Sequence, residues 1–281
     1  MLPRYSSSYS RAFTILELSI VVLILSLLAA AALRYASAVA ESRSYARSNE
    51  SLDVVENALL NYRITYGRLP CPADITIEDE TTFGNEIGTL GDGLCTGASF
   101  SNSGTDPDNA DGLYDATTVS NVVAGAVPVK ALKIDNRYAQ DAWGRKILYS
   151  VDRRMTAASA FLAYPVANTT IGGIVIKNNY NDSLANALTY KAIYALVSFG
   201  KNGHGGYVSN PGSSAVRYNN SSTNSDELKN CHCDSSAAAT SFDRIFVQKS
   251  KTAGSTTLTD SFDDITRFKT RYQVTTPLEM Q

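Results

Sequence analysis

The sequence predicts an α+β protein in which one long N-terminal helix precedes a globular head built on an antiparallel sheet. Two observations predict this architecture. Residues 13–66 contain no glycine or proline and are rich in helix-forming alanine, leucine, glutamate and arginine. Beyond Pro70 the composition changes to glycine, serine, asparagine, aspartate and threonine, interspersed with short runs typical of strands. A helix followed by a series of such strands is the α+β pattern.

The composition excludes several classes of protein. Of the 281 residues, 44% are hydrophobic and 19% are charged, and the formal net charge is −2. A chain of this length can bury a sizeable core. Neither general disorder nor nucleic-acid binding fits this balance of residues, so we expect no nucleic-acid partner.

The N-terminal half of the predicted helix has the length and polarity of a membrane span. Residues 13–33 carry a single charged side chain, Glu17. At about 1.5 Å per residue this run can cross a hydrocarbon core of about 30 Å. A cleaved secretory signal is the alternative, because small residues follow the apolar run around Ala38. Against that alternative, the helical pattern continues without a break through residues 34–66.

Residues 34–66 are expected to pack on the head. Their apolar side chains recur at spacings of three and four, which predicts a buried stripe of Leu52, Val55, Leu59 and Tyr62. Gly67 suits a left-handed cap and Pro70 cannot continue a helix, so the helix should end at Tyr66.

Glu17 is the single charged residue of the apolar run, so its position there needs a physical explanation. A carboxylate inside a bilayer costs at least about 2.5 kcal/mol on insertion scales, and such residues are functional candidates. The alternative is a bystander near the interface that reaches the cytoplasmic headgroups. Arg4 and Arg11 make the preceding segment positive, which predicts a cytoplasmic N-terminus and an outward-facing remainder.

The segment around Glu17 resembles a processing signal. Arg11-Ala12-Phe13-Thr14-Ile15-Leu16-Glu17-Leu18 is similar to the class III prepilin signal of type IV pilins and type II secretion pseudopilins. That signal is a small residue, usually glycine, followed by F-T-L-I-E-L and an apolar stretch. The resemblance implies that a prepilin peptidase cuts between Ala12 and Phe13. The leader 1–12 is then lost, and the apolar run stays on an N-terminally methylated mature protein. The sequence departs from the family in having Ala12 in place of glycine, and in lacking the proline or glycine that many relatives carry further into the mature helix.

The same resemblance implies a role for Glu17 and a set of partners. Cleavage creates an α-amine at Phe13, one helical turn from Glu17, and in a dry environment the two charges attract strongly. In the family this carboxylate recruits the neighbouring subunit. The implied partners are the prepilin peptidase, other pilin or pseudopilin subunits, an inner-membrane assembly platform and membrane lipid. The implied location is the bacterial inner membrane, crossed once, with the head in the periplasm or exposed on a filament.

Three segments of the head extend the resemblance. Residues 141–149, 198–206 and 262–268 are similar to the D-x-W-G-x-x-x-x-Y, S-Y-G-x-D-G-x-x-G-G and D-D-I-x-x-W segments of pseudopilins. Trp143 is interpreted as a core anchor rather than a binding aromatic.

The head itself is expected to cover residues 67–281. Candidate strands cover 146–151, 173–176 and 192–199, with a last helix or strand pair at 262–274. Residues 81–115 and 210–241 are polar, turn-rich and longer than ordinary connections, so they are interpreted as surface insertions.

Calcium is considered because the glycine loop helps to hold this ion in the major pseudopilins. The calcium candidates are Ser198, Asn202, Asp226 and Asp234. Asn202 stands where the family has aspartate, and the sequence favours a hairpin that needs glycine backbone angles. Residues 106–112 superficially suggest an EF-hand, but Asp111 occupies the sixth position, where glycine belongs, so an Asx-rich turn is expected.

The four cysteines can form disulfides if the chain is exported. They are Cys71, Cys95, Cys231 and Cys233, and three connectivities are open. A bond between Cys71 and Cys95 would close a loop of ordinary size and stabilise the fold by about 3 kcal/mol. Zinc is not expected at the Cys231-His232-Cys233 triplet, because one residue between thiols is shorter than usual and no second Cys/His pair is near.

These observations predict a structural protein rather than an enzyme. The expected function is a subunit of a type IV pilus-like or type II secretion pseudopilus filament. We expect a minor subunit, because the head is larger than the compact major subunits of that family. The alternative is a pilus-tip or surface adhesin whose loops bind a ligand. No G-x-S-x-G or H-E-x-x-H motif occurs and there are only two histidines, so neither catalysis nor a cofactor is expected.

Overall fold

The computed structural model describes residues 15–79, 81–101, 122–163, 171–210, 213–252 and 261–274. By their contacts, the residues form two compact units, Met1–Ser44 and Tyr45–Gln281. The first unit contains the N-terminal part of helix α1 (Ile15–Tyr66). The second contains the remainder of α1 and the head.

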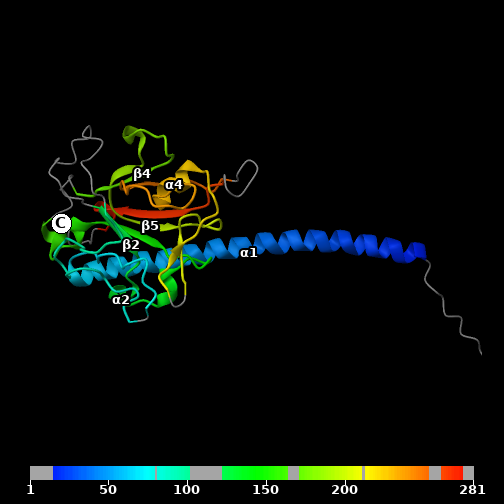
Figure 1. Ribbon diagram of the computed structural model, residues 1–281, viewed down its shortest axis with the longest axis horizontal. Coiled ribbons are helices and arrows are strands. Elements are labelled where there is room, and N and C mark those ends of the chain that lie inside the picture. The colour runs from blue at the N-terminus through cyan, green and yellow to red at the C-terminus, as the bar shows by residue number, and fades with distance from the viewer. Residues whose placement is uncertain are drawn as a thin grey trace, which may run out of the picture. The chain divides into compact units, whose positions relative to one another are not determined.

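Helix α1 is a continuous helix of 52 residues (Figure 1). It ends at Tyr66, where Gly67 takes a φ of +65° and donates its N–H to the carbonyl of Arg63 at 2.8 Å. The predicted end of the helix is therefore confirmed. The predicted stripe is confirmed as well, since these side chains are all buried in the head: Leu52, Val55, Leu59 and Tyr62.

The head is organised around a sheet of seven strands in the part of the chain that the structure describes, in the order β1-β2-β3-β5-β4-β8, with β9 also paired to β5. The strands are β1 (Phe100–Ser101), β2 (Val122–Ala126), β3 (Leu148–Asp152), β4 (Ile174–Lys177), β5 (Thr189–Ser198), β8 (Ile245–Val247) and β9 (Ile265–Thr270). Among these strands the pairs are antiparallel except β4 with β8, which is parallel. The predicted α+β class is confirmed, with a sheet that is mixed rather than purely antiparallel.

Shorter elements connect and cover the sheet. The helical ones are α2 (Val129–Leu132), η1 (Asn136–Ala139), η2 (Arg153–Thr156), α3 (Ala160–Ala163), η3 (Leu184–Asn186), α4 (Ser225–Cys231) and η5 (Tyr272–Val274). A second, two-stranded sheet joins β6 (Tyr207–Val208) to β7 (Val216–Arg217).

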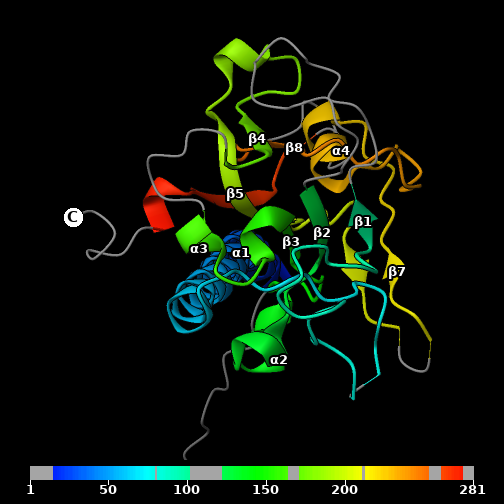
Figure 2. The ribbon, with the colours of Figure 1, turned by 90° about the vertical axis from the view of Figure 1, so that its left-hand side faces the viewer.

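Side chains that alternate along the central strands fill two cores, as expected for a sheet covered on both faces. Tyr149 and Val151 of β3 pack in the same core as the α1 stripe. Leu148 of β3 packs in the other core, together with Cys231 of α4 and Phe246 of β8. Helices α1 and α4 therefore cover opposite faces of the sheet (Figure 2).

The predicted strands correspond to β3, β4 and β5, with ends shifted by a few residues. The last predicted segment, 262–274, holds the single strand β9 followed by the short helix η5. These runs are recognisable because they are rich in β-branched and aromatic residues.

Residues 210–241, which the sequence suggested as a surface insertion, include a helix that is packed into the head. Helix α4 lies inside this stretch, and Glu227, Asn230 and Cys231 are buried. Asn230 can be buried because its side chain is satisfied: Nδ2 donates to the Val247 carbonyl at 3.1 Å and Oδ1 accepts from the Val247 N–H at 2.7 Å. Polarity alone therefore does not distinguish this buried helix from the exposed residues around it.

The D-x-W-G segment, which begins at Asp141, forms a turn that contacts α1. Asp141 Oδ1 accepts from the backbone N–H groups of Trp143 and Arg145 at 2.9 and 3.0 Å, and Oδ2 accepts from Ser198 Oγ at 2.8 Å. The Trp143 ring meets Tyr45 of α1 edge-on, with centroids 4.9 Å apart. Trp143 is half-buried and belongs to neither core, so it contacts α1 at the edge of the head and is not the core anchor that the sequence suggested.

Candidate functional site

The first candidate site is the N-terminal part of α1. From Ile15 to Leu33 every residue is exposed within the described structure. The helix contains an 18-residue window with mean hydropathy 2.6, none of it buried. One helix near the N-terminus is thus long and apolar enough to span a membrane. A core helix of a soluble protein would bury such a window, so this surface is suited to lipid or to other helices.

Glu17 lies in the first turn of α1 as the structure describes it. Its neighbours Leu16 and Leu18 are 71% and 61% exposed, so the carboxylate belongs to the same apolar surface. The processing residues Ala12 and Phe13 lie outside the described residues. A negative charge near a helix N-terminus is favourable because backbone N–H groups point toward it.

The second candidate site is a cluster of buried carboxylates in the head. Glu227 of α4 and the consecutive residues Asp263 and Asp264 are all buried, and one oxygen from each lies within 4.8 Å of the others. Glu227 and the Asp263–Asp264 pair are far apart in sequence. The fold brings them together where α4 meets the turn that leads into β9.

Hydrogen bonds hold these carboxylates in place. Glu227 Oε1 accepts from Asn202 Nδ2 at 2.6 Å, and its Oε2 accepts from Ser222 Oγ at 2.8 Å. Asp264 Oδ2 accepts from Asn230 Nδ2 at 2.9 Å. Asp263 Oδ2 accepts two backbone N–H groups of the glycine loop, both at 3.0 Å.

One oxygen of the cluster has no such bond. Asp263 Oδ1 is buried and lacks a hydrogen-bond partner among the described residues. Gly200 lies against it, and a Cβ added there would come within 2.3 Å of this oxygen. A glycine is therefore required beside the cluster, both for this space and for its φ of +59°.

Burial makes the cluster hard to ionise. It raises the pKa of Glu227 to about 7, and the neighbouring Asp263 charge acts in the same direction. Burial also raises the pKa of Asp263. The pKa of Asp264 lies well above its ordinary value because of burial and, after it, the charges of Glu227 and Asp263. Without a counter-charge, the three carboxyls do not all ionise near neutral pH.

These residues fit a divalent cation. Calcium prefers oxygen ligands, and three converging carboxylates supply them. The positive charge would offset the mutual repulsion of the carboxylates, and Asp263 Oδ1 is a buried oxygen available to it. Among the described residues, Glu227, Asp263 and Asp264 therefore form the carboxylate group that could hold calcium.

Of the four calcium candidates taken from the sequence, Asn202 alone reaches this cluster. Ser198 bonds Asp141. Asp226 forms an ion pair with Lys249 and accepts from the Tyr180 N–H at 2.6 Å. Asp234 caps its own turn through the N–H groups of Ser236 and Ala238. The Asp263–Asp264 pair was visible in the D-D-I segment, but nothing local connects that pair to Glu227.

The glycine loop itself forms the tight turn that the sequence favoured. Gly200, Gly203 and Gly205 all take positive φ angles, between +59° and +75°. The EF-hand-like residues 106–112 lie outside the described part of the chain.

Both disulfides are formed, between Cys71 and Cys95 and between Cys231 and Cys233. This pairing selects one of the three connectivities.

His204 lies near the sulfurs of the Cys231–Cys233 bond, but sulfurs in a disulfide offer no thiolate to zinc. The His204 ring is also occupied, since Nε2 lies 2.8 Å from the Asp234 carbonyl oxygen and Nδ1 accepts from the Asn220 N–H at 3.3 Å. His232 is buried against Phe242 and Phe246, and burial lowers its pKa to about 3.

No family model, curated protein or solved structure matches this chain. The fold and the sites define a protein with one apolar N-terminal helix of membrane-spanning length and a disulfide-bonded α+β head. That combination is loosely pilin-like.

Proposed function

We propose that this chain is a structural subunit of a filament of the type IV pilus or type II secretion pseudopilus kind, anchored in the bacterial inner membrane by α1. The observation that carries the proposal is that the two parts of one helix have different surroundings. Its N-terminal part exposes apolar side chains throughout, and its C-terminal part supplies the core stripe of the head. A secretory signal that is discarded needs no such continuation.

Glu17 is the assembly residue in this proposal. After cleavage before Phe13, the new amine of a neighbouring subunit pairs with the Glu17 carboxylate inside the membrane and sets the register between helices. A charge pair in a low-dielectric environment is strongly favoured over either isolated charge. The resemblance of residues 11–18 to the prepilin signal supports this role.

The mature N-terminus tests the anchor. The full chain would be expressed with a prepilin peptidase, purified from membranes and sequenced by mass spectrometry. A start at Phe13, with a methylated amine, is expected. A start after Ala38 would refute the proposal, because the apolar helix would then be absent from the mature protein.

Glu17→Val tests assembly. This variant should insert in the membrane and be cleaved like the wild type, yet fail to co-purify with the other filament subunits. Glu41→Val, the same substitution on the same helix beyond the apolar run, serves as the matched control and should co-purify normally. Equal co-purification of both variants would show that Glu17 has no register role.

A further inference from the structure

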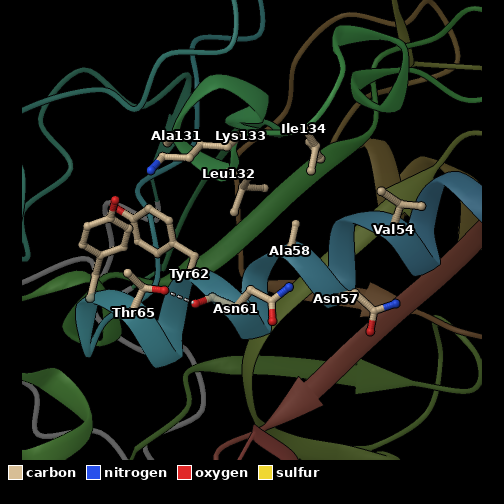
Figure 3. A pocket seen from close by; sticks show the side chains of 11 residues that line it. Val54, Asn57, Ala58, Asn61, Tyr62, Thr65, Ala131, Leu132, Lys133 and Ile134 are labelled. Carbon is tan, nitrogen blue, oxygen red and sulfur yellow. Dashed lines mark hydrogen bonds between the residues drawn. The ribbon is translucent and has the colours of Figure 1, made fainter.

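The groove beside α1 is lined by residues that are poor ligands for a metal ion. Figure 3 shows this groove between α1 and α2, with Tyr62, Leu132 and Ile134 along it. Among the described residues that line it, none is a cysteine, histidine, aspartate or glutamate. Thiolate and imidazole are the ligands that soft metal ions prefer. The side chains that can supply them lie on the opposite face of the sheet, at the C-terminal end of α4.

Three such side chains converge there. Cys231 is the last residue of α4, Cys233 follows two residues later, and His204 belongs to the glycine loop. Both sulfurs and one ring nitrogen of His204 lie within 4.8 Å of one another, and all three residues are buried. Ligand atoms bonded to one metal ion at about 2.0–2.3 Å are about 4 Å apart. The three side chains are therefore close enough to share one ion once the S–S bond is broken.

The backbone helps the disulfide to hold Cys231 and Cys233 side by side. His232 between them takes a φ of +46° and caps α4, and its N–H donates to the Lys229 carbonyl at 3.2 Å. The Cys233 N–H donates to the Leu228 carbonyl at 3.2 Å as well. Neither hydrogen bond involves a sulfur. Both therefore persist when the disulfide is reduced, and they keep the two thiols adjacent.

His204 has one ring nitrogen that keeps its lone pair. Nε2 lies 2.8 Å from the Asp234 carbonyl oxygen, which can only accept, so Nε2 carries the proton and Nδ1 is the acceptor. Histidine ligands of metal ions commonly donate their other ring N–H to a carbonyl in this way. Nδ1 accepts from the N–H groups of Asn220 and Ser222 at 3.3 and 3.4 Å. These are long hydrogen bonds, which a metal–nitrogen bond can replace.

We propose that Cys231, Cys233 and His204 bind the soft monovalent ion Cu(I) when the Cys231–Cys233 disulfide is reduced. Thiolate is a ligand that selects Cu(I), and two sulfurs with one nitrogen make a three-coordinate set. Structural zinc sites take four protein ligands, whereas this cluster supplies three among the described residues. Arg217 Nη2 donates to the Cys231 carbonyl at 3.0 Å, so a cation lies beside the site and favours the thiolate form. None of these residues belongs to α1, so the site does not depend on filament assembly.

Loading of the site takes two balanced steps. A dithiol reductant transfers two electrons and two protons to the Cys231–Cys233 bond, and its own sulfurs become a disulfide. Cu(I) then bonds to both sulfurs and to Nδ1 of His204. The two thiol protons leave to solvent, and copper keeps its oxidation state. Residues 234–236 directly follow Cys233 and are exposed, so this turn is the route by which both reactants reach the buried site.

Alkylation with and without copper tests the site in the full-length wild type. The protein in detergent would be reduced with a phosphine without oxygen, given one equivalent of Cu(I) buffered by a chelator, and treated with iodoacetamide. Mass spectrometry of the peptides then measures each cysteine separately. Cu(I) should slow the alkylation of Cys231 and Cys233 several-fold and leave Cys71 and Cys95 unchanged. Equal protection of both pairs, or protection of neither, would overturn the proposal.

His204→Gln tests the third ligand. It should weaken Cu(I) binding more than about tenfold in competition with the chelator, because even changes outside the ligand shell commonly cost that much. His232→Gln is the matched control and should keep the wild-type affinity, since the His232 ring packs against Phe242 and Phe246. Equal affinities of the two variants would contradict the role of His204, and equal protection by Zn(II) would contradict the assignment to Cu(I). The wild-type measurement decides the case if a variant fails to fold.

Discussion

Asn202 donates an amide hydrogen from Nδ2 to Oε1 of Glu227 across 2.6 Å, and this bond joins the glycine loop to helix α4 inside the head. A carboxylate in place of Asn202 would add a fourth acid to Glu227, Asp263 and Asp264. The asparagine is uncharged and instead stabilises the Glu227 carboxylate by donating a hydrogen bond to it. The head therefore carries three coupled acids, and their ionisation should govern its stability.

The contribution of Glu227 to the stability of the cation-free head should fall as pH rises to neutrality. Burial of His232 lowers the pKa of that side chain to about 3 and acts in the opposite direction below about pH 6.5. The pKa of Glu227 is raised from 4.5 to about 7 in the folded chain, so the folded state binds a proton that the unfolded state has lost. The stabilisation is complete below about pH 4.5 and is lost as pH rises through about 7, where each unit of pKa difference corresponds to about 1.4 kcal/mol. Thermal unfolding of the full chain in detergent, with a chelator present, measures the effect.

Glu227→Gln provides the control for this pH dependence. Glutamine mimics the protonated carboxyl, so the melting temperature of the variant relative to the wild type should rise between about pH 5 and about pH 8. The contribution of His232 is common to both proteins and cancels in this comparison. A melting temperature that changes with pH in the same way in the wild type and in Glu227→Gln, in chelator, would contradict the prediction.

Calcium should reverse the loss of stability above neutral pH. The ion would bind the three ionised carboxylates of the folded head and stabilise it by mass action. Asp263→Asn should abolish the calcium-dependent rise in melting temperature, because it removes a charge and alters Oδ1. Asp234→Asn, a change at an exposed turn, should leave the rise intact. A rise that survives Asp263→Asn and is lost in Asp234→Asn would place the site elsewhere.

Adjacent leucines of α1 should differ sharply in their contribution to stability. Leu59 is 1% exposed in the core, whereas Leu60 is 38% exposed to solvent. Leu59→Ala should lower the free energy of unfolding by about 2–5 kcal/mol, because it leaves a cavity. Leu60→Ala should cost less than about 1 kcal/mol. Denaturant titration of both variants checks the burial of the stripe, and equal losses would contradict the orientation of α1.

The two disulfides should also contribute unequally. The Cys71–Cys95 bond spans 24 residues, whereas Cys231–Cys233 spans two. In the loop-entropy relation the first stabilises by about 3 kcal/mol and the second by about half as much. Replacing each pair with serine, in separate variants, and comparing denaturation midpoints tests this order. A larger loss from the Cys231/Cys233 variant would show that its ring supports the fold by other means.

Local patterns explain why part of this fold was predictable. The absence of glycine and proline from residues 13–66, the apolar run and the stripe through Leu59 depend on helix geometry within a few turns. The end at Gly67 depends on a single residue's access to positive φ. The strands β3 and β5 were visible because branched and aromatic side chains suit a buried sheet.

The burial of α4 could not be predicted in the same way. Its sequence is polar, and residues such as Glu227 and Asn230 are buried because partners elsewhere in the chain accept or donate their hydrogen bonds. The parallel pairing of β4 with β8 is likewise a matter of topology, since neither strand's composition specifies its neighbour.

The sequence by itself determined the long helix, its apolar half with Glu17, its end at Gly67 and the α+β class. These features follow from composition and from periodicities of two and 3.6 residues, which act over short distances. The tertiary structure alone decided which cysteines pair and which acids converge with Asn202. Those arrangements depend on packing between residues that are distant in the chain, and short-range sequence patterns do not specify that packing.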